Sequence, residues 1–147
     1  MPENNSFSGV YPCYENQFKV GDEASPVNPV ADMEEYTLTI DNGVEEWHSF
    51  GEGGWIKRLM TAKSVKLAVK GKRNVGDPGN DYIAAKAFKN GKDAEGNVLW
   101  TFPDGSTLLL PNSIISVTAL GTAAATNVGP LEWEAQSNGA PTYTPAA

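Results

Sequence analysis

Apolar and polar residues alternate strictly in three separate stretches of this chain, and that alternation limits the folds open to it. In "SVKLAVKGK" the apolar positions are Val65, Leu67 and Val69, with Lys66 and Lys70 on the polar side. "PLEWEAQS" repeats the pattern with glutamates at the polar positions, and "YTLTI" repeats it with threonines. Successive side chains of a strand point to opposite faces, so each stretch predicts a strand with one buried face.

Turn signals divide the other apolar runs. "DNG" at 41–43 lies between "YTLTI" and "VEEWHSF", which predicts a first hairpin with its turn there. "NVLWTF" and "STLLL" flank "PDG" at 103–105 and predict a second hairpin. "SIISVTAL" is expected to form a further strand.

One segment has helical periodicity instead. Ile83, Ala84, Ala87 and Phe88 share one arc of a helical wheel, and a following "NG" suits a helix end. This predicts one short helix over about residues 80–90.

These elements together predict a mainly β chain, a β-sandwich or barrel-like fold with one short flanking helix and extended termini. Its 147 residues suffice for one domain with its own core. Residues 1–31 are polar and proline-rich without periodicity, so we expect an extended N-terminal arm. Residues 32–147 are then the single β-sandwich domain, with a long loop at 71–80 and an extended C-terminal tail at 138–147.

The net charge of −7 is distributed in three blocks of alternating sign. Residues 1–56 hold eleven acidic residues and one basic residue, residues 57–92 hold ten basic and two acidic residues, and residues 93–147 hold five acidic residues and no basic one. The basic block lacks the interleaved aromatic residues of proteins that bind single-stranded nucleic acid. Contact between the unlike blocks of two copies is the alternative, and such head-to-tail contact builds rings or filaments.

Two apparent ligand motifs fail at a required position. Residues 71–76 have the glycine spacing of a phosphate-binding loop, but Asp77 and Pro78 stand where its lysine and hydroxyl residue are needed. "DAEGN" begins like a calcium loop, but Val98 replaces the glycine that makes the sharp bend. We therefore expect no nucleotide, no metal and no cofactor.

No catalytic constellation is visible either. Cys13 and His48 are the only cysteine and histidine, so an intramolecular disulfide and a cysteine-based zinc site are excluded. The glutamate pairs fall where neighbouring side chains point to opposite faces or to solvent, unlike the facing carboxylates of a glycosidase. Without a leader segment or a run of roughly 18 apolar residues, we expect a protein that is not an enzyme, has no membrane anchor and is made in a reducing cytoplasm.

The order of three longer segments resembles a known family. "VKLAVKGKRNVGDPGNDYIAAKAF" is followed by "WTFPDGSTLLLPNSIISVTAL" and then by "GPLEWEAQSNGAPTYTP". Over about residues 36–145 this succession resembles the major tail tube protein of long-tailed, siphovirus-like bacteriophages of Gram-positive hosts. Its most specific parts are the basic loop that leads into the helix and the closing "GAPTYTP".

The resemblance implies a structural virion protein that self-assembles into hexameric rings, which stack into the phage tail tube. In that family one sheet of each subunit joins its neighbours into an inner β-barrel, and double-stranded DNA passes through the lumen without specific binding. The implied partners are further copies of the chain, the tape-measure protein, and the tail-terminator and distal tail proteins. The implied location is the virion tail, assembled in the host bacterial cytoplasm.

Two sets of residues are singled out for such a tube. The subunit-interface candidates are the basic loop and a tryptophan in a glycine-rich turn: Lys70, Lys72, Arg73, Asp77 and Trp55. An acidic lumen repels phosphate, so the lumen-facing candidates are Glu45, Glu132 and Glu134.

Two of the four tryptophans, Trp100 and Trp133, are in phase with apolar strand faces and are expected in the core. Exposed tryptophans on a β scaffold also suit sugar stacking. The alternative function is therefore a non-catalytic β-sandwich binding module, for carbohydrate or for tail-tip adhesion.

Overall fold

The computed structural model describes residues 9–121 and 124–146. Its helical elements are two 3-10 turns and one α-helix: η1 (Cys13–Glu15), α1 (Pro78–Ala85) and η2 (Gly91–Ala94). Its strands are β1 (Gln17–Gly21), β2 (Asn28–Pro29), β3 (Met33–His48), β4 (Ile56–Lys72), β5 (Glu95–Thr101), β6 (Thr107–Leu120), β7 (Pro130–Gln136) and β8 (Thr142–Thr144).

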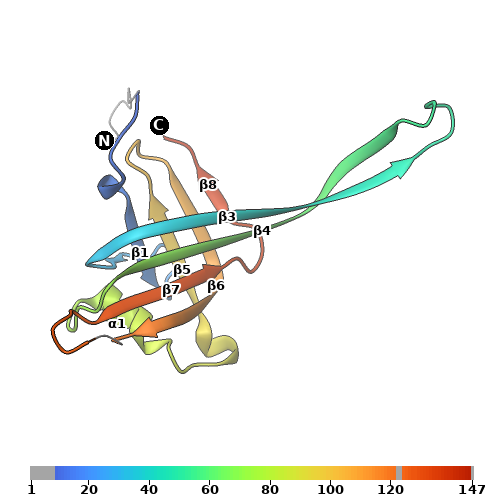
Figure 1. The fold of residues 1–147 in the computed structure, drawn as a ribbon. Coiled ribbons are helices and arrows are strands. Elements are labelled where there is room, and N and C mark those ends of the chain that lie inside the picture. Colours follow the sequence, from blue (N-terminus) through green and yellow to red (C-terminus); the bar gives the residue numbers. More distant parts are fainter. Residues whose placement is uncertain (1–8, 122–123, 147) are drawn as a thin grey trace.

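All eight strands belong to one antiparallel sheet that folds over on itself. The order is β2-β1-β5-β6-β7-β4-β3, with β8 also paired to β6. β6 turns the corner, because its first half pairs with β5 and β8 while its second half pairs with β7. One layer, here called the four-stranded layer, consists of β3, β4, β7 and residues 114–120 of β6. It crosses over the layer of β1 and β5 (Figure 1), so the mainly β fold with one helix is confirmed.

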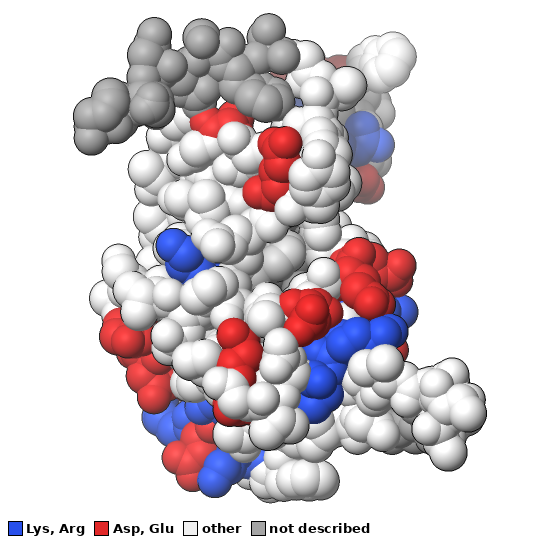
Figure 2. Space-filling view, turned by 90° about the vertical axis from the view of Figure 1, so that its left-hand side faces the viewer, with Lys and Arg blue, Asp and Glu red and all other residues white. Residues whose placement is uncertain are grey.

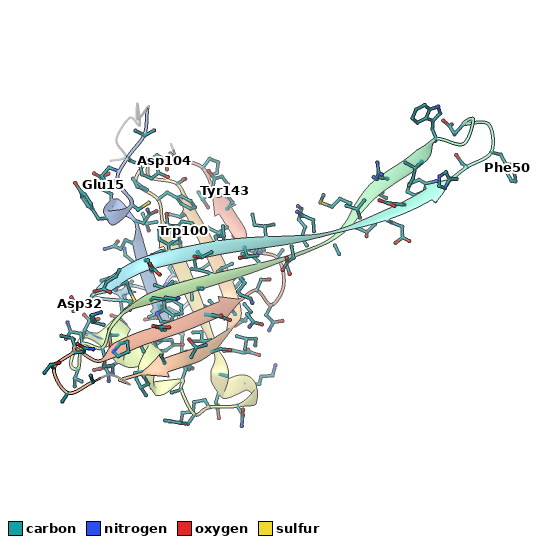
Figure 3. All side chains as sticks on the ribbon, in the orientation of Figure 1. Glu15, Asp32, Phe50, Trp100, Asp104 and Tyr143 are labelled. Atoms are coloured by element: carbon teal, nitrogen blue, oxygen red, sulfur yellow. The ribbon has the colours of Figure 1, made fainter. Side chains whose placement is uncertain are left out.

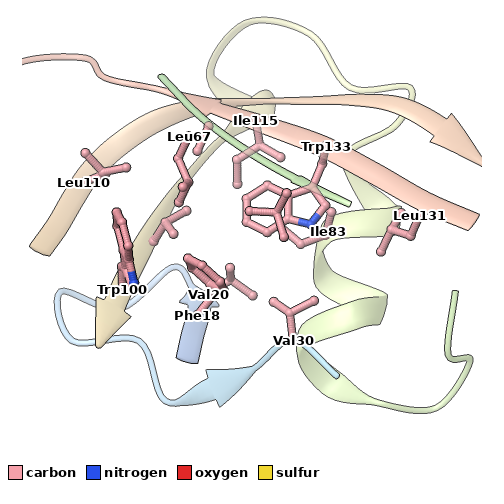
Figure 4. Close-up of a cluster of buried hydrophobic side chains, with 13 residues drawn as sticks. Phe18, Val20, Val30, Leu67, Ile83, Trp100, Leu110, Ile115, Leu131 and Trp133 are labelled. Atoms are coloured by element: carbon pink, nitrogen blue, oxygen red, sulfur yellow. The ribbon is translucent and has the colours of Figure 1, made fainter. Parts of the chain in front are cut away.

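The core lies between the two layers and under α1 (Figure 4). Most of the inward positions predicted from alternation are buried or partly buried, although Ile40 is 53% exposed. Trp100 and Trp133 are only 4% and 1% exposed. The buried apolar residues are Phe18, Val20, Val30, Leu67, Val69, Ile83, Val98, Trp100, Leu110, Ile115, Leu131, Trp133 and Ala135. Period-2 alternation therefore located most of the core strands correctly.

The predicted N-terminal arm differs from the structure. β1 lies inside the sheet, between β2 and β5, and its Phe18 and Val20 are buried. The alternation in β1 covers only five residues, and the surrounding prolines and polar residues obscure it. Residues 17–30 thus belong to the sandwich, while residues 1–8 of the expected arm lie outside the described residues.

The predicted turn at 41–43 is also wrong, because β3 continues through it to His48. A bulge at Gly43 and Val44 absorbs the irregularity instead. Gly43 is needed there, since a Cβ atom on it would meet the Cβ of Ala62 on the partner strand at 2.9 Å. The chain reverses at 49–55, where Gly51, Gly53 and Gly54 all have positive φ angles.

Helix α1 is shorter than predicted. Asp77 caps its start by accepting a hydrogen bond from the Asn80 backbone N–H, and regular helix ends at Ala85. After it the backbone N–H groups of Lys86, Ala87 and Lys89 bond three residues back, in the tighter 3-10 manner. This change of pitch leaves Phe88 90% exposed, whereas the helical wheel predicts it on the inner face.

The two predicted irregular segments are ordered in part. The loop predicted at 71–80 comprises only residues 73–77 in the structure, because β4 extends to Lys72 and α1 begins at Pro78. Within the tail at 138–147, Thr142–Thr144 forms β8 and pairs with β6. Both segments therefore lie against the sandwich.

Replacing Gly79 by alanine is expected to destabilise the protein, although this exchange within a helix usually stabilises it. The added Cβ would overlap the backbone carbonyls of Asn28 and Pro29, so α1 must move off β2, at a cost of about 1–3 kcal/mol. Urea unfolding measures the change. Ala85→Gly, at the exposed end of the same helix, is the control and should cost about 0.5–1 kcal/mol; a more stable Gly79→Ala protein would contradict the packing described here.

Candidate assembly surfaces

A long two-stranded hairpin projects from the sandwich. Among the described strands, residues 41–48 of β3 and 56–64 of β4 pair only with each other. Figure 1 shows this projecting hairpin (residues 41–64) reaching far beyond the body. Several of its side chains are large, apolar and exposed: Val44, Trp47, Phe50, Trp55, Leu59 and Met60. An isolated two-stranded hairpin is marginally stable in water, so this element is suited to contact another molecule.

The tip of the projecting hairpin carries two aromatic side chains. The Phe50 side chain is fully exposed and Trp55 is 78% exposed. Figure 3 shows Phe50 at the far end of the projecting hairpin. Trp55 was predicted as an interface residue from its glycine-rich surroundings. The structure places it on the most protruding part of the chain, and its role at an interface stays a prediction.

A groove lies at the opposite end of β3. The two ends of the folded sheet, β1–β2 and β3, face each other here without pairing, and the space between them measures about 580 Å³. Its apolar lining comes from both sides: Tyr14, Phe18, Val30, Met33 and Tyr36. Asp32, Glu34 and Glu35 also line it. We call this feature the edge groove.

The floor of the edge groove is held by an aromatic cluster. The rings of Phe18 and Tyr36 meet edge to face with centroids 5.4 Å apart, and Trp100 contacts both. Burial raises the pKa of the Tyr36 hydroxyl, and its contact with the Cys13 thiol adds to the shift. Asn16 connects the cluster by accepting from the Trp100 indole and donating to Tyr36. The groove is therefore a built apolar recess.

The predicted basic loop is anchored within the chain. The Arg73 guanidinium donates to Asn80 Oδ1 at 2.9 Å and to Asp81 Oδ1 at 2.8 Å, and Lys72 pairs with Glu34 at 3.2 Å. Asp77 caps α1 and also accepts from the backbone N–H of Ala31. The structure thus gives Arg73 and Asp77 structural roles, and Lys70 and Lys72 are the members of the set with basic groups on the sheet surface.

Lowering the pH is expected to release this anchor. The hydrogen bond from Arg73, then the Gly76 backbone N–H, lowers the pKa of Asp81 below its ordinary 3.8. A carboxyl whose pKa is lowered by folding stabilises the protein at pH values above its pKa in the unfolded state. This stabilisation is lost as the pH falls through its pKa in the folded state. NMR titration should give a midpoint below 3.8 that returns toward 3.8 in Arg73→Ala; an unchanged midpoint in that variant would show that Arg73 is not the cause.

Two of the three glutamates predicted to face a lumen, Glu132 and Glu134, lie on the outer face of the four-stranded layer. Glu132 and Glu134 alternate with the buried residues of β7, whereas Glu45 lies on the projecting hairpin. In the sheet register Glu132 is opposite Lys70, and Lys66 approaches Glu134 at 4.0 Å on the neighbouring strand. This face therefore has mixed charge instead of being uniformly acidic.

The charge blocks of the sequence largely neutralise each other inside the chain. The acidic strand β3 pairs along its length with the basic strand β4, and Arg58 and Lys57 bond to Glu46 and Glu52 on the hairpin. On the side of the molecule in Figure 2, acidic and basic side chains are intermixed. The blocks therefore do not form one acidic and one basic face for two copies to match.

Within residues 9–121 and 124–146, no group of three or more histidine, cysteine, aspartate or glutamate side chains is arranged to hold a metal ion. In the same residues no helix is long and apolar enough to cross a membrane.

Comparison with known proteins extends this reading of the fold. No family model and no curated protein matches the chain. A chain from the virion of a native gene transfer agent (GTA) particle matches with a TM-score of 0.71 at 15% identity, over 92% of this chain and all of that one. A chain from the tail of an empty GTA particle, solved with C6 symmetry, matches with a TM-score of 0.69 at 17% identity and the same coverage.

A third similar chain comes from the PVC sheath-tube complex of an extracellular contractile injection system. Its TM-score is 0.64 at 15% identity, over 94% of this chain and 93% of that one. The chain has a tail tube protein fold. At these identities the likeness concerns the fold alone, so the bacteriophage type and the host are not determined by it.

Sequence reasoning missed both the projecting hairpin and the edge groove. A signal for the hairpin was present, because "GEGGW" holds three glycines within four residues, which is stronger turn chemistry than "DNG". The edge groove left no comparable signal, because no local sequence pattern records that β1–β2 and β3 fail to pair.

Proposed function

We propose that this protein is a structural, non-catalytic subunit that self-assembles into rings, and that the rings stack into a tail tube. The observation that carries the proposal is that the four-stranded layer ends in two unpaired strand edges. Unpaired edges expose rows of backbone N–H and C=O groups that can pair with another chain. The shared fold with components of tails and sheath-tube complexes supports the same role.

The two edges are well defined. β3 is the last strand of the sheet, so one side of its 16 residues has no partner among the described strands. On the other side of the layer, the pairing of β6 with β5 ends at Ile114, and Ile115–Leu120 pairs only with β7 among the described strands. Joining β3 of one copy to this part of β6 in the next would extend the layer from copy to copy.

Strand direction supports this joining. Each neighbouring pair in the layer is antiparallel, and the layer has an even number of strands, so β3 and β6 run in opposite directions. When two copies have the same orientation, β3 of one copy therefore runs antiparallel to β6 of the next. The two edges can then pair in the same antiparallel manner as the strands within the layer. Contacts between unlike surfaces of identical copies close into rings when the rotation between copies allows it.

A six-fold ring is proposed from the family resemblance, and the C6 symmetry of the GTA tail with the same fold supports it. In such a ring the outer face of the four-stranded layer, with Glu132 and Glu134, lines the lumen. Its lysines reduce the repulsion of double-stranded DNA, while the remaining acids still disfavour tight phosphate contact. Tape-measure, tail-terminator and distal tail proteins are the further partners proposed, in a virion assembled in the host cytoplasm.

A proline at the β6 edge tests the proposal. Thr118 lies at a β-bulge and has no register partner on β7. A proline is tolerated at such a bulge, so the subunit should still fold, but a proline on an edge strand blocks pairing with another copy. Thr61→Pro is the matched control, because Thr61 also lies at an exposed bulge, on β4. Sedimentation velocity should show ring-sized species for the wild type and Thr61→Pro, and monomers for Thr118→Pro.

Two results would count against the proposal. A wild-type protein that stays monomeric at every concentration and salt would contradict self-assembly. Normal rings from a folded Thr118→Pro protein would remove the β6 edge from the interface.

A further inference from the structure

The chain contains three Asn-Gly pairs, Asn42–Gly43, Asn90–Gly91 and Asn138–Gly139, and the fold places them in different surroundings. We propose that Asn138–Gly139 is a site of spontaneous covalent modification, at which the asparagine is converted into aspartate or isoaspartate, while the fold protects the other two pairs. Asparagine is among the chemically labile residues of proteins. Assembly plays no part in this reaction, so the inference stands or falls separately from the proposed function.

The reaction needs only the main chain, hydroxide and water. Hydroxide removes the proton of the Gly139 backbone N–H, and the nitrogen attacks the side-chain carbon Cγ of Asn138. A C–N bond forms, the bond from Cγ to the side-chain amide nitrogen breaks, and that nitrogen leaves as ammonia after it takes a proton from water. Water then opens the resulting cyclic imide at either of its carbonyls, which gives aspartate or isoaspartate. No atom is oxidised or reduced.

Asn138 and Gly139 have the freedom that ring closure requires. Both are exposed, and neither makes a hydrogen bond to any other residue in the described part of the chain. A Cβ atom added to Gly139 would meet nothing within 4 Å, and its φ of 102° is a conformation that glycine adopts readily. The two reacting atoms can therefore reach the attack geometry on which the rate of an intramolecular reaction depends.

The chain on both sides of this pair is anchored. The Ser137 backbone N–H donates to the carbonyl of Val65 at 2.8 Å, and the Val65 N–H donates to Ser137 Oγ at 3.0 Å. At the other end Thr142 pairs with Leu109 on β6. Figure 1 shows the connection from β7 to β8 curving outside the sheet. The pair can therefore react without any unfolding of the sandwich.

Asn42–Gly43 has the same two residues in a protected setting. Both belong to β3 and are in register with Lys63 and Ala62 on β4. The Lys63 ammonium also donates to Asn42 Oδ1 at 2.7 Å. The strand fixes the backbone nitrogen and the hydrogen bond fixes the side-chain amide, so the hairpin must open before the ring can close.

Asn90–Gly91 is exposed but its main chain is held in a turn. The Asn90 carbonyl accepts a hydrogen bond from the Asp93 backbone N–H at 3.2 Å. Gly91 is the first residue of η2. The peptide group between Asn90 and Gly91 is therefore fixed by the turn that follows it, so this pair should also react more slowly than Asn138–Gly139.

The modification changes both charge and geometry. Conversion of the Asn138 amide into a carboxylate adds one negative charge to the connection between β7 and β8. An isoaspartate also adds one carbon to the main chain between Ser137 and β8. Stored protein is therefore expected to become a mixture of charge forms.

Peptide mapping of aged protein tests the proposal. The dilute, folded wild-type chain is kept in mildly alkaline buffer and digested after glutamate at intervals, which leaves Asn138 as the only asparagine in its peptide, residues 135–147. Mass spectrometry should show this peptide replaced by two acid forms of equal mass that elute separately, one with aspartate and one with isoaspartate. Asn138 should react at least about tenfold faster than Asn42 or Asn90, whose pairs must open first.

Two controls separate the effect of the fold from that of the sequence. In urea-unfolded wild type the three pairs should react at similar rates, because their surroundings are then alike. Asn138→Gln keeps a side-chain amide but places it one carbon further from the Gly139 nitrogen, and its peptide should stay unchanged.

Three results would overturn the proposal. The first is a folded protein in which Asn42 or Asn90 reacts as fast as Asn138. The second is an Asn138 that reacts in urea and not in the folded chain. The third is an acid form of the Asn138 peptide with aspartate alone, which would show direct hydrolysis without a cyclic imide.

Discussion

Replacing Trp133 by alanine is expected to lower the free energy of unfolding by about 3–5 kcal/mol. Trp133 is 1% exposed, and its strand lies between β4 and β6, opposite Val69 on one side and Val117 on the other. Figure 4 shows its indole next to Ile83 of α1. Truncation leaves a cavity that touches the helix and the four-stranded layer together. Since domains of this size are stable by about 5–15 kcal/mol, urea unfolding should show a large loss.

Two further variants serve as controls for Trp133→Ala. Trp55→Ala removes the same side chain from a 78% exposed site and should change monomer stability by less than about 0.5 kcal/mol. Trp133→Phe should cost less than Trp133→Ala, because the Trp133 indole N–H has no hydrogen-bond partner among the described residues. Equal losses for Trp133→Ala and Trp55→Ala would contradict the described core.

Replacing Asn80 by alanine is expected to cost about 3 kcal/mol, because it leaves several part-buried backbone groups without their hydrogen-bond partner. The Asn80 side chain is fully buried. Its amide donates to the carbonyls of Ala31 and Lys72, and its carbonyl oxygen accepts from Arg73 and from the Asn74 backbone N–H. One side chain thus joins the end of β4, the loop after it and the segment before β3. The melting temperature should fall by roughly 6–12 °C at 2–4 °C per kcal/mol.

The charge-changing variant Asn80→Asp sharpens this prediction. An aspartate of the same shape would direct a carboxylate oxygen at the Ala31 and Lys72 carbonyls, so we expect it to be at least as destabilising as alanine. Asn90→Ala is the surface control, since Asn90 is exposed and makes no side-chain cap bond. A stable Asn80→Asp protein would show that the amide donors are unimportant.

Much of the fold could be predicted from the sequence because its core strands are half-buried. Val65, Leu67 and Val69 in β4, and Leu131 and Trp133 in β7, alternate with polar residues, and that period survives in the structure. β1 was missed because Phe18 and Val20 form too short a run among polar residues and prolines. Long-range pairing, which decides such segments, leaves no local pattern.

The candidate surfaces could be predicted only in part. The exposed position of Trp55 followed from the glycines around it, and Glu132 and Glu134 followed from strand alternation. The sequence suggested that Arg73 was available to another copy, but Asn80 and Asp81 in the first turn of α1 bind it. Charge blocks in a sequence indicate an external partner only when the strands that carry them do not pair with each other.

Electron microscopy of the concentrated wild-type protein tests the central claim most directly. We expect hollow tubes built of stacked rings with six-fold symmetry, in which the four-stranded layers of neighbouring copies join edge to edge around each ring. A preparation that contains only single, correctly folded chains at all concentrations would contradict the account.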